Sequence, residues 1–226
     1  MSLEAEHEAV KLVVTQRCFY LFAALLLLLI SVPFLEGTPR GLITLNIVNA
    51  SVLIAALAAV ARSRICLIIG VLLAGPTVAF QILSFVGNEP RYLALSRAFG
   101  AAFYVVTVVY MLGYVLRRQT FTVDKLYGAA ATFLMLGVLW SYFYGLMLPF
   151  YPGSLSSGGT PMKTFLVSDM VYFSFTVLTS TGFGDIAPTH PVMRMLCMLE
   201  QVTGVLYLAI LIARLASAYP PSQERA

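Results

Sequence analysis

The stretch TVLTSTGFGDIAP, at residues 176–188, places two glycines, several hydroxyl side chains and an aspartate in an otherwise apolar chain. Glycine adopts backbone conformations that are closed to other residues. Gly182 and Gly184 can therefore let successive carbonyl groups aim at one axis, where carbonyl oxygens replace the hydration shell of a cation. We expect cation binding by backbone oxygens, with no enzymatic reaction and no cofactor.

The elements that position this stretch are expected to lie in a membrane. The chain has 226 residues, of which 60% are hydrophobic and only 11% are charged, a composition outside the range of soluble globular proteins. Non-helical backbone at membrane depth is costly unless it is buried in protein or lines a watery cavity. A glycine-rich loop in such a chain therefore implies an aqueous pore.

Six apolar runs have close to the roughly 20 residues that span a hydrocarbon core. A shorter run at residues 168–180, as a helix, could cross little more than about half of the bilayer, so we expect it to enter and come back out. The sequence thus predicts an all-α membrane protein with six transmembrane helices and a re-entrant helix before the loop. The predicted spans are residues 18–35, 41–61, 65–88, 98–116, 126–149 and 195–213.

The distribution of lysine and arginine predicts that both termini lie in the cytoplasm, because basic residues are retained on that side. The inner side would hold nine of the 14 basic residues, namely Lys11, Arg17, Arg62, Arg64, Arg117, Arg118, Lys125, Arg214 and Arg225. The outer side would hold Arg40, Arg91, Arg97, Lys163 and Arg194. A cleaved signal peptide is the competing interpretation of the first run, although three glutamates precede that run. No basic cluster interleaved with aromatic residues occurs, so nucleic acid is not an expected partner. Membrane lipids are expected partners because of the apolar spans.

The segment TSTGFGD, at residues 179–185, resembles the selectivity-filter sequence of the potassium-channel superfamily, usually written T-T-V-G-Y-G-D. MVYFSFTVLTS, at residues 170–180, resembles the pore helix of that family, and LEQVTGVLYLAILIARLAS, at residues 199–217, resembles its inner helix. The resemblance covers about residues 121–218. It implies a potassium-selective channel of the compact prokaryotic type in the cell (plasma) membrane, made of six-helix subunits with one pore loop each.

The resemblance also implies the domain organisation and the oligomer. Residues 1–120 would form a four-helix transmembrane scaffold, residues 121–218 the pore domain, and residues 219–226 a short cytoplasmic tail. One chain supplies one filter strand and no second copy of the motif occurs, so a symmetric homo-oligomer is expected, and the family's number is four.

By the same resemblance, potassium ions would be bound along the filter formed by Ser180, Thr181, Gly182, Phe183 and Gly184. The ligands would be the carbonyls of Thr181, Gly182 and Phe183, with the carbonyl and hydroxyl of Ser180. Three residues depart from the family's usual pattern. Ser180 replaces threonine, Thr181 replaces valine and needs a polar partner, and Phe183 replaces tyrosine and lacks its hydroxyl. Each departure could loosen the filter, which favours a weakly selective cation channel as the alternative.

Five further residues are expected to support or gate the filter. Thr179 would close the pore helix, and Asp185 at the outer mouth would accept a hydrogen bond from Tyr172. Glu200 is either a buried contact that braces the filter from behind or a hydrogen-bonded packing residue. Gly204 is either a gating hinge or a site of close helix packing.

The first four helices are expected to act as a scaffold and not as a conventional voltage sensor. A sensor needs several arginines along the fourth helix, whereas the predicted span 98–116 has none, and Arg97, Arg117 and Arg118 only flank it. His190 could sense external pH, but a single histidine in an exposed loop is more often simply solvated.

Two other classes of function fit the sequence less well than a channel does. A subunit of a potassium uptake transporter typically has several pore repeats with degenerate filters, whereas this chain has one repeat with both glycines. A phosphate-binding glycine loop would need a Lys-Ser/Thr ending, which is absent. The outer segment at residues 151–161, rich in Gly, Ser and Pro, is expected to be irregular and exposed to water.

Overall fold

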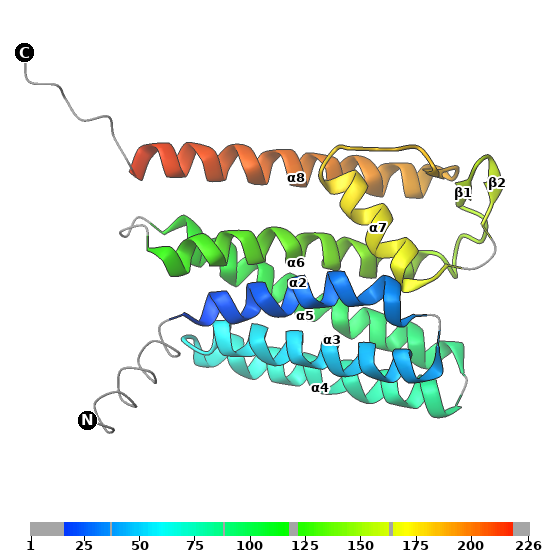
Figure 1. Cartoon of the computed structure of the whole chain (residues 1–226), viewed down its shortest axis with the longest axis horizontal. Helices are drawn as coiled ribbons and strands as arrows, with labels where there is room; N and C mark the ends of the chain where they lie inside the picture. The colour runs from blue at the N-terminus through cyan, green and yellow to red at the C-terminus, as the bar shows by residue number, and fades with distance from the viewer. Residues whose placement is uncertain (1–15, 37, 88, 118–121, 163–164, 219–226) are drawn as a thin grey trace, which may run out of the picture.

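A computed structural model of the chain describes residues 16–36, 38–87, 89–117, 122–162 and 165–218. Within these ranges the fold consists of long helices that run side by side, with a three-stranded sheet at one end (Figure 1). The helices are α2 (Arg17–Leu35), α3 (Pro39–Val60), α4 (Arg64–Gly87), α5 (Pro90–Leu116), α6 (Val123–Met147), α7 (Val167–Leu178) and α8 (Pro191–Ala218).

Six of the described helices, α2 to α6 and α8, are long and apolar enough to cross a membrane, and α7 is shorter. The predicted all-α membrane fold is therefore confirmed. The two ends of the described chain, the start of α2 and the end of α8, lie at the same end of the bundle (Figure 1). Several residues used in the orientation argument, Lys11, Arg118, Lys163 and Arg225, lie outside the described residues, as does the predicted tail at residues 219–226.

All six long helices begin earlier than predicted, and the two with the largest differences, α5 and α8, both begin with proline. α5 starts at Pro90 and not at residue 98, and α8 starts at Pro191 and not at residue 195. Proline fits the first turn of a helix because its missing N–H has no intrahelical partner there. The predicted apolar spans begin directly after a charged residue, Arg97 or Arg194, whereas the helices already include that residue. Arg97 therefore lies inside the fourth long helix, contrary to the expectation that it flanks the helix.

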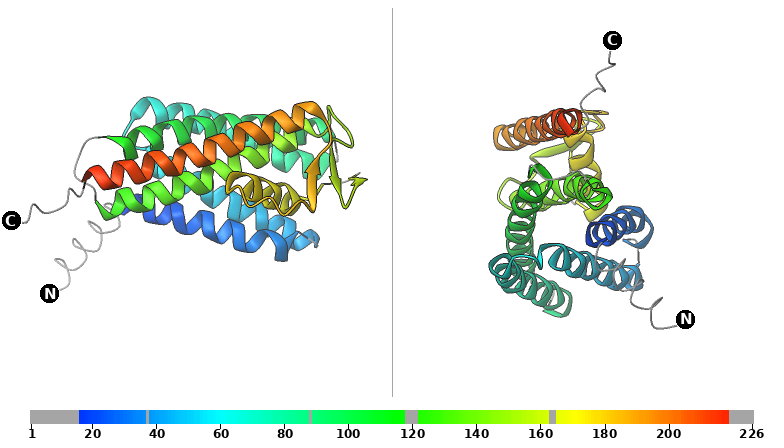
Figure 2. Two further views of the ribbon diagram at one scale, coloured as in Figure 1. Left: turned by 90° about the horizontal axis from the view of Figure 1, so that it is seen from above. Right: turned by 90° about the vertical axis from the view of Figure 1, so that its left-hand side faces the viewer.

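The first four helices form a bundle beside the carboxyl-terminal part of the chain (Figure 2). α2 packs against α3 and α6, and α5 packs against α4 and α6. α8 lies at the opposite edge of the molecule from α3 and α4 (Figures 1 and 2). The core between these helices is filled by fully buried side chains that include Leu21 and Leu25 of α2, Phe103 and Met111 of α5, and Met135 of α6.

The outer segment at residues 151–161 was predicted to be irregular, but it forms part of a small sheet. Strands β1 (Leu155–Ser157), β2 (Thr160–Pro161) and β3 (Ile186–Pro188) are antiparallel in the order β2-β1-β3. Gly158 and Gly159 lie between β1 and β2, where two glycines suit a two-residue hairpin turn. Leu155 is buried, so the segment is also less exposed than expected. The sequence did not reveal these strands because the hairpin is short and its partner, β3, lies far along the sequence.

Candidate functional site

The short helix α7 ends in a loop of residues 179–185, which we call the 179–185 loop. The start of the loop folds back against the last turn of α7. The amide of Thr179 donates to the carbonyl of Phe175 at 3.1 Å, and the amides of Thr181 and Gly182 both donate to the carbonyl of Thr176, at 2.9 and 3.1 Å. The carboxyl-terminal end of α7, where the helix dipole is negative, thus holds the loop and favours a cation nearby.

The direction of the loop carbonyls follows from these amide contacts. A trans peptide is planar, so its C=O and N–H groups point in opposite directions. Because the N–H groups of Thr181 and Gly182 point at Thr176, the carbonyls of the same two peptide units, those of Ser180 and Thr181, point away from α7. Ser180 and Thr181 are both exposed in the described part of the chain.

The loop backbone alternates between two conformations. Ser180, Gly182 and Gly184 have positive φ angles of 56°, 54° and 80°, and the residues between them do not. Ser180 is the only non-glycine residue with positive φ among the described residues. A left-handed conformation costs such a residue on the order of 1–2 kcal/mol. Backbone strain of this kind is characteristic of functional sites.

The carbonyl oxygens of the loop are free to act as ligands. Within the described part of the chain, the carbonyls of residues 180–184 accept no hydrogen bond, whereas the carbonyl of Asp185 accepts one from the amide of Gly158 at 3.2 Å. The loop is also exposed, and Phe183 shows 70% of its surface. Unpaired, exposed carbonyl oxygens along one strand are suitable ligands for a dehydrated cation.

Thr181 has the polar partner that its position requires. Its hydroxyl lies 2.8 Å from the hydroxyl of Thr179, which in turn lies 2.7 Å from the carbonyl of Phe175 and donates to it. The loop is therefore tied to the last turn of α7 by side chains as well as by amides. Thr179 caps the helix as expected, since it follows the last residue of α7 and its amide donates to the carbonyl of Phe175.

Tyr172 contacts both Asp185 and Phe183. Its hydroxyl donates a hydrogen bond of 2.8 Å to the Asp185 carboxylate, which confirms the predicted contact. This hydrogen bond raises the pKa of the Tyr172 phenol above its usual value. The rings of Tyr172 and Phe183 are nearly parallel, with centroids 6.4 Å apart. Phe183, which has no hydroxyl, therefore contacts α7 through its ring.

Glu200 is fully buried between three helices. Its carboxylate, on α8, accepts a hydrogen bond of 2.6 Å from Ser174 of α7 and one of 2.5 Å from Tyr144 of α6. Ser174 lies two residues before Thr176, whose carbonyl holds the loop. The predicted buried contact behind the loop is thus present, and its effect on the loop stays a prediction. The sequence did not single out Ser174 or Tyr144, because isolated hydroxyl residues are common in apolar helices.

Gly204 lies where α8 crosses the end of α7. A Cβ atom at this position would collide with the backbone carbonyl oxygen of Leu178, the last residue of α7. α8 continues without interruption through Gly204. The close-packing interpretation therefore has a direct contact in the structure, whereas the hinge role stays a prediction.

The sequence suggested that His190 is a solvated side chain in an exposed loop, and the structure does not agree. His190 is half-buried, its ring lies against the Tyr151 ring with centroids 4.5 Å apart, and its Nδ1 accepts a hydrogen bond of 3.3 Å from the amide of Val192. The residue precedes α8 immediately and satisfies one of the amides at its start. Its contacts are accordingly those of a helix cap.

Comparison with known proteins agrees with this geometry. A family model described as an ion channel matches residues 121–219, a range that contains α6, α7, the 179–185 loop and α8. No curated protein and no solved structure matches the chain. The carboxyl-terminal part of this membrane-spanning chain, residues 121–219, is therefore similar to an ion-channel family.

Proposed function

We propose that the protein is a potassium-selective channel that conducts passively through a pore formed by four identical chains. The observation that carries this proposal is the set of carbonyls at residues 180–184, which are unpaired within the described chain and lie in an exposed loop. Four such strands around one axis would surround a cation with oxygen ligands. Potassium would be bound by Ser180, Thr181, Gly182 and Phe183.

The exposed surface of α8 supports a closed ring of chains. Ser180 lies beside a hollow that is lined also by Gln201, Val202, Val205 and Leu206 of α8. The three apolar residues of this group are more than half exposed in the single chain. Identical chains that share one axis would place these α8 faces around the ion path, on the cytoplasmic side of the filter.

The scaffold supports a channel without a conventional voltage sensor. α5 contains Arg91 and Arg97, both near its start, and no arginine in the rest of its length. Arg97 donates a hydrogen bond of 2.6 Å to the carbonyl of Gly145 in α6, so it is attached to the pore-domain side. A mobile sensor needs several arginines that cross the field. We place both termini in the cytoplasm and the protein in the cell membrane.

A weakly selective cation channel is the second candidate, and the filter surroundings favour it over a transporter subunit. Phe183 stacks on Tyr172 without a hydrogen bond, and Ser180 holds a strained conformation. A filter wall tied by fewer hydrogen bonds is more deformable and discriminates less sharply between cations of different size.

The proposal is tested by ion flux from liposomes that contain the purified protein. Potassium-loaded vesicles should lose potassium only when the protein is present, and cross-linking should give a ladder that ends at four chains. A monomer or dimer that carries no flux would reject the pore, and equal efflux of sodium would favour the second candidate.

A further inference from the structure

The end of the first described helix is joined to the start of α7. The Glu36 carboxylate, immediately after α2, accepts hydrogen bonds from the amides of Val167 and Ser168, the latter at 2.7 Å. These are the first two amides of α7, and such amides have no acceptor within their own helix. The end of α2 and the start of α7 also lie side by side in Figure 1.

This connection replaces packing that is otherwise incomplete. A cavity of about 140 Å³ is lined by residues of α2 to α7, among them Leu28 and Val32 of α2 and Val167 and Met170 of α7. Across the described residues, the two bonds to Glu36 are the only hydrogen bonds between α2 to α5 and α7. The contact is also electrostatically favourable, because a carboxylate at the amino-terminal end meets the positive end of the helix dipole.

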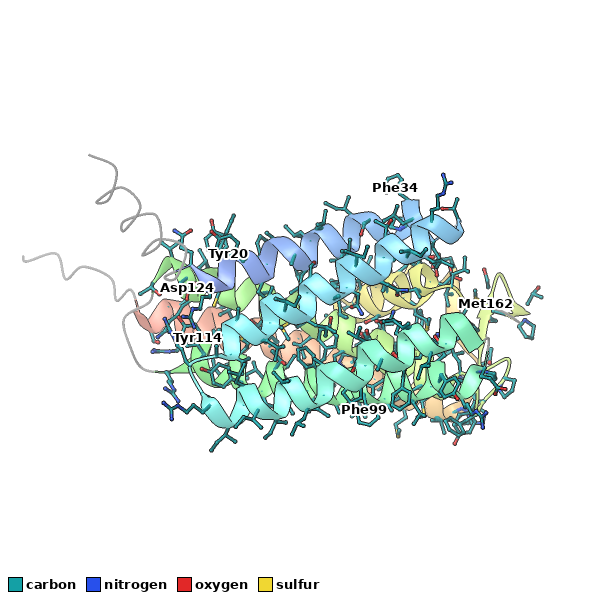
Figure 3. The ribbon with its side chains drawn as sticks, turned by 90° about the horizontal axis from the view of Figure 1, so that it is seen from below. Tyr20, Phe34, Phe99, Tyr114, Asp124 and Met162 are labelled. Atoms are coloured by element: carbon teal, nitrogen blue, oxygen red, sulfur yellow. The ribbon has the colours of Figure 1, made fainter. Side chains whose placement is uncertain are left out.

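The other end of α2 is held in a similar way. The carboxylate of Asp124, in the first turn of α6, accepts from the amide of Cys18 at 3.1 Å and from the hydroxyl of Tyr114 at 2.8 Å. Tyr114 and Asp124 lie together at the end of the molecule opposite Met162 (Figure 3). α2 is thus attached to the carboxyl-terminal part of the chain at both ends, by Asp124 at one and Glu36 at the other.

We propose that Glu36 is a positioning residue, which fixes the start of α7 to the scaffold and so transmits displacements of α2 to the 179–185 loop. α7 has 12 residues, so it is about 18 Å long. The Thr176 carbonyl near its far end holds two loop amides. A shift at Glu36 therefore reaches the ion ligands through one short helix. The functional part of this inference rests on the proposed channel function, and the attachment itself does not.

Asp169 provides a matched control at the same end of α7. Its carboxylate accepts a hydrogen bond of 3.1 Å from the amide of Leu166, three residues earlier. Asp169 thus caps the helix from within the same segment and does not join it to the scaffold. Replacing Asp169 weakens the same helix end, whereas replacing Glu36 also disconnects that end from α2.

The first arm of the test measures backbone hydrogen exchange across residues 165–178 in the full-length protein. Glu36→Ala should speed exchange of the first α7 amides by roughly tenfold, since charged hydrogen bonds are lost. Glu36→Gln, which keeps the size and one neutral acceptor, should give a smaller increase. Unchanged protection in both variants would overturn the attachment, whether or not the protein conducts.

The second arm compares potassium and sodium efflux from liposomes. Glu36→Ala should lower the potassium-to-sodium flux ratio several-fold, and Asp169→Ala should leave the ratio within about twofold of the wild type. Transmission from α2 to the loop would be rejected if both variants changed the flux ratio equally. It would also be rejected if Glu36→Ala left the flux ratio unchanged although the α7 amides exchanged faster. In either case Glu36 would act only as a helix cap. Absence of flux in the wild type would reject the proposed function and with it transmission to the filter, and the exchange arm would still decide the attachment.

Discussion

The hydroxyl of Ser174 on α7 donates a hydrogen bond of 2.6 Å to the carboxylate of Glu200 on α8. Both residues are fully buried, and the second oxygen of Glu200 accepts from Tyr144. An ionisable group at this depth is costly unless it is hydrogen-bonded. The contact joins α6, α7 and α8 directly behind the 179–185 loop, so we expect the loop conformation to depend on these buried side chains.

Glu200→Gln should lower the potassium-to-sodium permeability ratio or shorten the conducting state. Glutamine presents an amide N–H group where one hydroxyl now donates to a carboxylate oxygen, so that hydrogen bond must reverse its direction or be lost, at a cost of up to about 3 kcal/mol. The measurement is single-channel recording in planar bilayers. Glu89→Gln is the control, because Glu89 is a half-exposed partner of Arg91 at the surface. Currents identical to the wild type in Glu200→Gln would contradict the bracing role.

Tyr172→Phe should destabilise the conducting state while leaving the fold intact. The substitution removes the 2.8 Å hydrogen bond to Asp185 and keeps the ring that faces Phe183. The hydroxyl is solvent-exposed, so the free energy of unfolding should change by less than about 1 kcal/mol. Mean open time is the quantity to measure, with Tyr20→Phe on exposed α2 surface as the control. Equal open times for all three proteins would remove Asp185 from the filter support.

Gly204→Ala should destabilise the protein, because the new methyl group collides with the Leu178 carbonyl and forces α8 away from α7. Overpacking of this kind costs about 1–3 kcal/mol. The matched variant is Gly113→Ala, since a Cβ at Gly113 meets nothing within 4 Å. That variant should be neutral or more stable by up to about 1 kcal/mol, the helix propensity difference.

Thermal unfolding in detergent separates these two glycine variants, and open probability then addresses the hinge. A stable Gly204→Ala protein with normal opening would contradict both the packing and the hinge roles of Gly204. A destabilised protein whose opening is normal once it is reconstituted would leave packing as its role.

Opening of the channel should depend only weakly on membrane voltage. Arg97 is anchored to Gly145, Arg91 lies in the first turn of α5, and α5 has no arginine after Arg97, so little charge can cross the field. The measurement is open probability over a range of voltages for the wild type and Arg97→Gln. A steep voltage dependence that flattens in the variant would show that α5 moves as a sensor.

The parts of the structure that the sequence predicted are those set by local pattern. Six apolar helices and one half-length helix follow from run length, and the 179–185 loop follows from the spacing of Gly182 and Gly184. The contact between Tyr172 and Asp185 was expected from the family resemblance, which fixes the relation between the pore helix and the loop.

The missed features are contacts between residues far apart in the chain. Glu36 and the amide of Val167 are separated by 131 positions, and a glutamate after an apolar run looks like an ordinary surface charge. Tyr144 and Glu200 are separated by 56 positions. The start of α5 was placed late because hydropathy ends at Arg97, although the arginine stem and its bond to Gly145 are compatible with a continuing helix.

The most direct test of the central claim is the reversal potential of the reconstituted protein under opposed potassium and sodium gradients. Gly182→Ser is the diagnostic variant, because Gly182 has a φ of 54° that other residues rarely adopt, and Gly113→Ser is the same change at an open helix position. We predict a reversal potential close to the potassium equilibrium value in the wild type and Gly113→Ser, and loss of that selectivity in Gly182→Ser. A wild-type reversal potential midway between the two equilibrium values, unaffected by Gly182→Ser, would contradict a potassium-selective filter at residues 180–184.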